Sequence, residues 1–277
     1  MTVATRVVAL VVAWGLWACA PTGDAAPVCY SETLPEVDVI VAGSGSNLPL
    51  VEALLAQWPE RGAVHVLVPE SIGSSGAIAA LSDGVIDVGL VSRPLRPDEQ
   101  RDDWAVVPFA RTPVAVVRHA PGGEDALTFD ALVAIFLGEQ RTWADGTPIV
   151  PILREAGDSG EAVIAAIDPS LALVMDDARA ADRWQVALTD QAMRTALVET
   201  PGAIGLLDLG VVGRDPSLAV VTLDGRHPSD AQAWPFMKTL SIVVPEGASD
   251  DARRLADWLT HPDRHEDVHA LGWLAPL

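Results

Sequence analysis

Short runs rich in β-branched residues alternate with helical patterns along most of this chain, and this alternation constrains the fold more than any other feature. Residues 37–42 predict a buried strand, which is followed by a glycine and serine loop at 43–47 and an apolar-periodic helix to Trp58. Residues 64–68 and 85–91 predict two more strands. This alternation predicts an α/β fold, in which helices flank a mainly parallel sheet.

Later patterns continue the alternation. Further strands are expected at residues 106–109, 114–118, 149–154, 203–207, 218–223 and 239–244, and helices at 77–81, 128–137, 159–167, 190–199 and 250–259. Extended crossings near residues 111–113 and 234–236 would divide this fold into two lobes. We expect lobe I to comprise residues 36–111 and 239–277, lobe II to comprise 112–238, and a ligand to bind in the cleft between them.

The N-terminal residues carry signals for export rather than for the fold. Residues 1–18 resemble a signal peptide, and their apolar run is shorter than the ~20 residues that span a bilayer. The sequence before Cys19 resembles a lipobox and predicts a lipid anchor on that cysteine, although Trp17 departs from the pattern. Cleavage at a nearby alanine, with Cys19 free to pair with Cys29, is the alternative. Residues 19–35 would then be a flexible tether.

The net charge of the chain limits the classes of partner that it can bind. The chain has 18 Lys+Arg against 38 Asp+Glu, a formal net charge of −20, and Lys238 is its single lysine. A polyanion would be repelled, so we expect no nucleic-acid partner. A small anion would also feel no long-range attraction, and its affinity would have to come from donors within about 8 Å.

Three loops share one local pattern, in which a predicted strand is followed by a loop rich in glycine and serine and then directly by a helix. The loops are residues 43–47, 73–76 and 157–160. Each can present backbone N–H groups and hydroxyls at the positive end of a helix dipole, although serine and aspartate are also ordinary N-caps. Together they predict a concave site for a small oxyanion, with Ser46, Ser74, Ser75 and Ser159 among its donors.

Arg154 lies at the end of a predicted strand, five residues before Ser159, and can supply a charged fork to the same site. Asp158 and Glu161 lie in the third loop and carry the opposite charge. They can hold Arg154 in place or accept a proton from a protonated ligand, but they would repel a fully ionised one. A surface ion pair between Arg154 and Glu155 or Asp158 is the alternative.

Six ordered motifs resemble the phosphate-binding-protein family of periplasmic solute receptors. They span about residues 37–277 and comprise residues 41–50, 71–76 and 87–95, residues 135–138 with Trp143, Arg154 with residues 158–160, and residues 200–205. The resemblance implies a type II periplasmic-binding-protein fold, whose two lobes close around an oxyanion and deliver it to an ABC transporter permease. It implies no catalysis, no metal and no organic cofactor.

The resemblance also implies roles for single residues. Asn47 and the backbone of Leu48 stand where phosphate receptors have a threonine and the residue after it, and Ser74 belongs to the second loop. Arg154, Ser159 and Gly160 match the family's arginine and Ser-Gly pair. Three departures leave the choice among phosphate, sulfate, tungstate and molybdate open: Ser92 stands where some receptors have an aspartate, Glu161 replaces a threonine, and one extra residue separates Arg154 from Ser159.

Three rival functions have weaker support. The run from Gly157 to Gly160 matches the sequence around a serine-protease nucleophile, but it follows an α/β strand and opens a helix. His261, His265 and His269 would share one face of a helix and suggest a metal site. The alternative interpretation is an ordinary solvated C-terminal helix. Four tryptophans are expected in cleft loops, namely Trp104, Trp143, Trp184 and Trp234. They suggest a platform that binds carbohydrate, and the alternative is ordinary core packing.

We therefore expect an exported, monomeric receptor on the periplasmic or cell-surface side of the membrane, anchored through a lipid at Cys19. Its partners would be a small inorganic oxyanion, most simply phosphate, and an ABC transporter permease. The alternative is a membrane-tethered scaffold or sensor that keeps the fold but binds another ligand or none.

Overall fold

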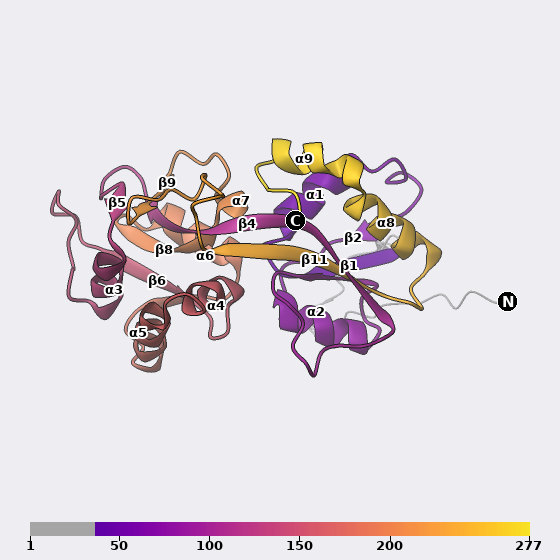
Figure 1. The fold of residues 1–277 in the computed structure, drawn as a ribbon, viewed down its shortest axis with the longest axis horizontal. Coiled ribbons are helices and arrows are strands. Elements are labelled where there is room, and N and C mark those ends of the chain that lie inside the picture. The colour runs from indigo at the N-terminus through magenta and orange to yellow at the C-terminus, as the bar shows by residue number, and fades with distance from the viewer. Residues whose placement is uncertain (1–36) are drawn as a thin grey trace, which may run out of the picture. The chain divides into compact units, whose positions relative to one another are not determined.

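The computed structural model describes residues 37–277, and the predictions for Cys19, Cys29, the signal peptide and the tether lie outside these residues. Within the described residues no helix is long and apolar enough to cross a membrane. The helices and strands form two lobes, which β4 (Trp104–His119) and β11 (Met237–Pro245) join (Figure 1).

Lobe I contains three parallel strands and the helices that cover them. Its elements are β1 (Val39–Gly43), α1 (Leu48–Leu55), β2 (Val66–Leu67), α2 (Gly73–Ser82), β3 (Val88–Val91), α8 (Asp250–Thr260), the 3-10 helix η1 (Pro262–Arg264) and α9 (His265–Ala270). Side chains alternate between the faces of β1, so that Val39 and Val41 pack with α1 and α8 while Ala42 packs with α2.

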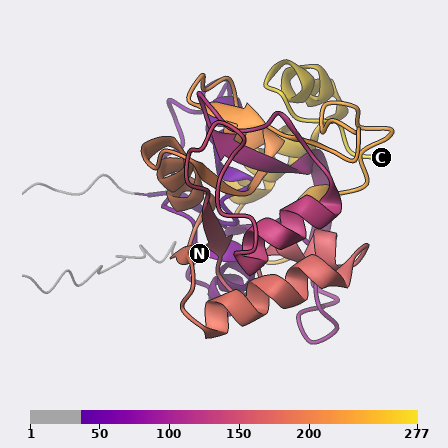
Figure 2. The same ribbon diagram turned by 90° about the vertical axis from the view of Figure 1, so that its left-hand side faces the viewer.

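Lobe II has the same layered plan. Its elements are β5 (Ala126–Leu127), α3 (Phe129–Leu137), β6 (Val150–Arg154), α4 (Ser159–Ala165), α5 (Pro169–Ala180), β7 (Gln185–Ala187), α6 (Asp190–Glu199), β8 (Ala203–Asp208), α7 (Leu209–Val212), β9 (Leu218–Val220) and β10 (Thr222–Leu223). α3 and α5 lie side by side over one face of its sheet (Figure 2), and α6 and α7 cover the other face.

One path of hydrogen-bonded strands runs through both lobes, in the order β2-β1-β3-β11-β4-β8-β6-β7. The outer strands pair in parallel, as the alternation predicted, whereas β4 and β11 pair antiparallel with each other and with their outer neighbours. The expected α/β two-lobe fold is therefore confirmed.

The crossing expected near residues 111–113 is no separate linker, because it lies inside the continuous strand β4. Ala110 packs in a hydrophobic cluster of lobe I and Val114 in one of lobe II, so the cores divide between these residues. The boundaries at 111/112 and 238/239 remain our proposal.

The helices α2 and α5 differ from the sequence expectation, and the short α7 was not expected. Residues 73–76, expected as a turn, form the first turn of α2, which carries no side-chain cap at its N-terminus. α5 was not expected, although its start has two recognisable signals: Asp168 caps the helix by accepting from the N–H of Ser170, and Pro169 occupies its first turn.

The end of β1 shows why a glycine is needed beside the cleft. Gly43 has φ +152°, and a Cβ at this position would lie 2.1 Å from the carbonyl oxygen of Leu90 in β3. Only glycine permits this approach, which brings the loop after β1 against the end of β3.

Candidate functional site

A cavity of about 300 Å³ lies at the carboxyl ends of β1, β6 and β7, where ligands of α/β folds bind. Five segments from both lobes line it: Ser44 and Gly45, residues 71–75, Arg93 and Arg96, residues 154–159, and Leu188 with Asp190.

Serine hydroxyls from four segments meet at Ser92, which directly follows β3. The Oγ of Ser92 lies 2.8 Å from the Oγ of Ser44, 3.4 Å from that of Ser74 and 2.9 Å from that of Ser159. Ser44, Ser74 and Ser92 belong to lobe I and are buried, and Ser159 belongs to lobe II. Because a hydroxyl can donate or accept, these four groups can turn their O–H bonds toward a bound anion. We call them the serine cluster.

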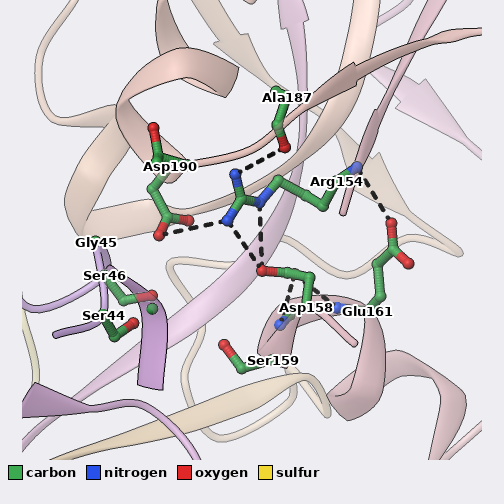
Figure 3. A network of polar contacts seen from close by, with 12 residues as sticks. Ser44, Gly45, Ser46, Arg154, Asp158, Ser159, Glu161, Ala187 and Asp190 are labelled. Atoms are coloured by element: carbon green, nitrogen blue, oxygen red, sulfur yellow. Dashed lines mark hydrogen bonds and ion pairs between the residues drawn. The ribbon is translucent and has the colours of Figure 1, made fainter. Parts of the chain in front are cut away.

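Arg154, the last residue of β6, is buried at 5% exposure, and each nitrogen of its guanidinium has a partner in the protein (Figure 3). Its Nε and Nη2 donate to Oδ2 of Asp158 at 3.3 and 3.2 Å, and its Nη1 donates to the carbonyl of Ala187 at 3.1 Å. Oδ2 of Asp190 lies 3.9 Å from Nη2. Burial lowers the pKa of Arg154, but the charges of Asp190 and Asp158 outweigh this effect and raise it.

Asp158 caps α4 with its other carboxylate oxygen. Its Oδ1 accepts from the N–H of Gly160 at 2.9 Å and from that of Glu161 at 3.2 Å. The sequence suggested free N–H groups in the third loop, but the aspartate occupies two of them, those of Gly160 and Glu161. α1 and α2, in contrast, start without a side-chain cap.

Glu161 points away from the cavity (Figure 3). Its carboxylate pairs with Arg179, with Nη1 to Oε2 at 2.8 Å, and accepts from the backbone N–H of Arg154 at 3.3 Å. Burial raises the pKa of Glu161 to about 7, against the opposing effect of Arg179. This residue holds the backbone behind the site and does not line it.

In the first loop, Ser44 and Gly45 line the cavity, whereas Asn47 and Leu48 do not. Nδ2 of Asn47 donates to the carbonyl of Val91 at 3.3 Å, while its buried Oδ1 has no hydrogen-bond partner in the described residues. Leu48 starts α1 and lines a separate cavity with α6. The predicted residues at the cavity wall are thus Ser74, Ser75, Arg154, Asp158 and Ser159, with Ser92 bonded to them.

Sequence reasoning missed a buried ion pair beside the serine cluster. Nζ of Lys238, in β11, lies 2.8 Å from Oδ2 of Asp208 and 2.8 Å from Oγ of Ser46. Both charged residues are buried, and the carboxylate of Asp208 belongs to lobe II while Ser46 belongs to lobe I. Burial lowers the pKa of Lys238, but Asp208, Asp190 and Asp158 raise it overall. The single lysine of the chain, placed in a mainly apolar strand, was the available signal.

Asp190 was missed as well, because the first residue of a predicted helix looks like ordinary helix-start chemistry. The structure buries it at 6% exposure in the cavity wall, opposite Gly45 (Figure 3). Burial raises its pKa to about 6, even though Lys238 and Arg154 oppose the shift.

Two rival sites find no support in the geometry. The Oγ of Ser159 pairs with Ser92, and no histidine lines the cavity, so the histidine of a Ser-His-Asp triad does not accompany the protease-like motif. The shared helical face expected for the three C-terminal histidines is wrong, since His261 precedes the 3-10 turn that Pro262 starts and α9 begins only at His265. Among residues 37–277, no group of three His, Cys, Asp or Glu is placed to hold a metal.

None of the four tryptophans expected in cleft loops lines this cavity. Trp143 and Trp234 are buried, and their indole N–H groups donate to the carbonyls of Gly202 and Val114. Trp184 donates to the carbonyl of Phe136, and Trp104 lines a different cavity of about 460 Å³ in lobe I. The core-packing interpretation fits all four, because Trp184 and Trp104 are partly buried and pack against hydrophobic clusters of lobe II and lobe I.

Comparisons with known proteins agree with this geometry. Three solved structures are similar in fold. A Clostridium perfringens protein, described as a phosphate ABC transporter substrate-binding protein with bound phosphate, has TM-score 0.72 and 20% identity over 86% of this chain and 99% of that one. An ABC-type phosphate transport receptor from Vibrio cholerae has TM-score 0.59 and 18% identity over 86% and 100%. The periplasmic molybdate-binding protein of Azotobacter vinelandii has TM-score 0.59 and 13% identity over 86% and 100%.

No curated protein matches the chain. A family model described as a PBP superfamily domain matches residues 30–263, which is most of the chain. The motifs that resemble solute receptors, the two lobes and this match agree, and the chain belongs to the PBP superfamily.

Proposed function

We propose that this protein is an exported solute receptor that captures a small oxyanion, phosphate first among the candidates, and hands it to an ABC transporter permease. The observation that carries the proposal is the serine cluster, whose hydroxyls come from both lobes and lie beside the buried Arg154. Several neutral donors beside a buried cationic group suit an anion that must be stripped of water.

Capture would proceed by closure of the two lobes. A ligand that contacts Ser44, Ser74 and Ser92 in lobe I and Ser159 in lobe II favours the closed form, because only that form offers all contacts at once. The uncapped start of α2 adds backbone donors on the lobe I side.

Phosphate is preferred because it carries a proton near neutral pH. Asp158 and Asp190 both line the cavity, and a carboxylate beside an oxyanion needs a hydrogen between them. The solved relatives described as phosphate receptors share the fold and add support from outside this chain.

Titration calorimetry with phosphate, sulfate and molybdate tests the proposal. The full chain is expressed for export with Cys19→Ser, which prevents lipid attachment. We expect saturable binding of phosphate with one site per chain. The lipid anchor is tested separately: labelled palmitate should enter the unaltered chain and not the Cys19→Ser variant.

A non-transport scaffold is the second candidate, and one observation favours it. The donors of the cleft are satisfied by the protein itself, through the bond from Ser92 to Ser159 and the cap that Asp158 places on α4. A scaffold predicts no heat from any of the three oxyanions, whereas a receptor predicts heat from at least one.

A further inference from the structure

We propose that Asp190 is the proton-binding residue of the cleft, so that the receptor captures an oxyanion and one proton together. The inference rests on the proposed function, and it concerns a residue that neither the sequence motifs nor the serine cluster points to.

Asp190 lies where lobe II contacts lobe I. It is the first residue of α6 in lobe II, and a Cβ on Gly45 of lobe I would lie 2.6 Å from its Oδ2. The neighbouring Gln191 donates from Nε2 to the carbonyl of Gly45 at 3.2 Å. The carboxylate of Asp190 therefore lies in the wall of the closed cavity, where a ligand between the lobes would meet it.

The carboxylate of Asp190 is poorly satisfied for a buried charge. Within residues 37–277 its side chain has one ion pair, to Arg154 at 3.9 Å, and accepts no hydrogen bond. Asp158, in contrast, accepts from Arg154 and from two backbone N–H groups. A buried carboxylate without such donors gives up its charge more readily by taking a proton.

The charges that face Asp190 come from every element around it. Arg154 of β6 and Lys238 of β11 are positive, while Asp158 at the start of α4 and Asp208 at the end of β8 are negative. With Asp190 ionised, three carboxylates face two cations, and an incoming anion adds to the excess. One proton taken up by Asp190 together with the anion offsets the negative charge that the anion brings.

The direction of each pKa agrees with this assignment. Burial raises the pKa of Asp190 to about 6, whereas Lys238, Arg154 and the backbone N–H groups outweigh burial at Asp158 and hold its pKa below the ordinary value. Between Asp158 and Asp190, Asp190 is therefore the one that binds a proton near neutral pH.

Binding of an anion next to Asp190 raises its pKa further, so the complex holds more protons than the free protein. By linkage, affinity falls as the pH rises above about 6, by up to tenfold per pH unit until the pKa of the complex is passed.

Calorimetry of phosphate binding in buffers of different ionisation enthalpy counts the protons taken up. The full chain with Cys19→Ser is compared with the same chain carrying Asp190→Asn, and the difference cancels protons that phosphate itself exchanges. At pH 7 we expect the parent chain to take up close to one proton more than Asp190→Asn. Glu161→Gln, which removes the other carboxyl with a raised pKa, should keep this uptake.

The outcomes separate the inference from the proposed function. Phosphate binding with equal proton uptake in the parent chain and Asp190→Asn overturns the inference and leaves the receptor intact. No binding of phosphate, sulfate or molybdate by the parent chain between pH 5 and pH 8 overturns both. If Asp190→Asn does not fold, sulfate serves as the probe with the parent chain, because its own charge is constant over this range. A fall in its affinity toward tenfold per pH unit between pH 6.5 and pH 8 supports the inference, and a flat profile overturns it.

Discussion

The hydroxyl of Ser92 lies 2.9 Å from the hydroxyl of Ser159, across the cleft between the two lobes and 67 residues along the chain. The same hydroxyl lies 2.8 Å from that of Ser44 and 3.4 Å from that of Ser74. Ser92 therefore joins the loop after β1, the first turn of α2 and the start of α4. Because these hydroxyls already bond one another across the cleft, a ligand must replace hydrogen bonds between the lobes with hydrogen bonds to the ligand.

Ser92→Ala tests the centre of the serine cluster. The variant removes one direct donor and leaves three hydroxyls without their shared partner, so phosphate affinity should fall by about 1–2 kcal/mol, roughly tenfold. Titration calorimetry measures the loss. Ser82→Ala, on the outer part of α2, is the matched control and should bind as the parent does, whereas equal affinity in both variants would remove Ser92 from the site.

Arg154→Ala should weaken phosphate binding by at least ~2 kcal/mol, because it removes the buried charged donor of the cavity. It also leaves Asp158 and Asp190 without their cation, so the free energy of unfolding should drop by about 3–5 kcal/mol. Arg154→Lys keeps the charge but not the planar fork and separates the two effects. A folded Arg154→Lys with parent affinity would show that the fork does not bind the ligand.

Lys238→Met tests the buried ion pair beneath the cleft. Since Asp208 would lose its partner at 2.8 Å, urea unfolding should show a loss of about 3–5 kcal/mol, and Asp208→Asn in the same chain should restore part of it. Arg254→Met is the control, because its pair with Glu60 at 3.0 Å is exposed and screened by solvent, so its loss should change stability little. Equal losses in both variants would contradict a special role for the buried pair.

Gly45→Ala should hinder closure of the lobes. The new Cβ would lie 2.6 Å from Oδ2 of Asp190 and 2.8 Å from Oε1 of Gln191, so these side chains must shift or α6 must move away from the first loop. We expect weaker phosphate binding with little change in the melting temperature. Gly62→Ala, whose Cβ would have no atom within 4 Å, is the matched control. A Gly45→Ala chain that binds as tightly as Gly62→Ala would count against closure at this contact.

Stability should fall as the pH rises from about 4.5 to about 7. Burial raises the pKa of Glu161 from 4.5 to about 7 in the folded chain, so in this window the folded state holds a proton that the unfolded state has lost. The contribution of this group is full below pH 4.5 and is lost as the pH passes 7, on the order of 2–3 kcal/mol. Urea unfolding at several pH values measures it, and Glu161→Gln should flatten this part of the profile. An unchanged slope in Glu161→Gln would assign the effect to another carboxyl.

Local patterns in the sequence were enough to predict the fold class and several residues of the cavity wall. The alternation of strands and helices predicted the α/β lobes, and the glycine and serine loops predicted Ser74 and Ser159 at the cavity wall. These inferences succeed because strand ends and helix starts depend on residues a few positions apart, and the carboxyl ends of parallel strands meet at one edge of a sheet. The unexpected α5 also had local signals, in Asp168 and Pro169.

The electrostatics of the cleft were decided only by the tertiary structure. Lys238 meets Ser46 across 192 residues and Asp208 across 30, and no local rule links such positions. The same holds for Asp190 beside Gly45 and Arg154. Burial and the distance between charges determine their pKa values, and both arise only when the two lobes pack. The sequence alone thus determined where donors gather, while the packing of the lobes decided which charges surround them.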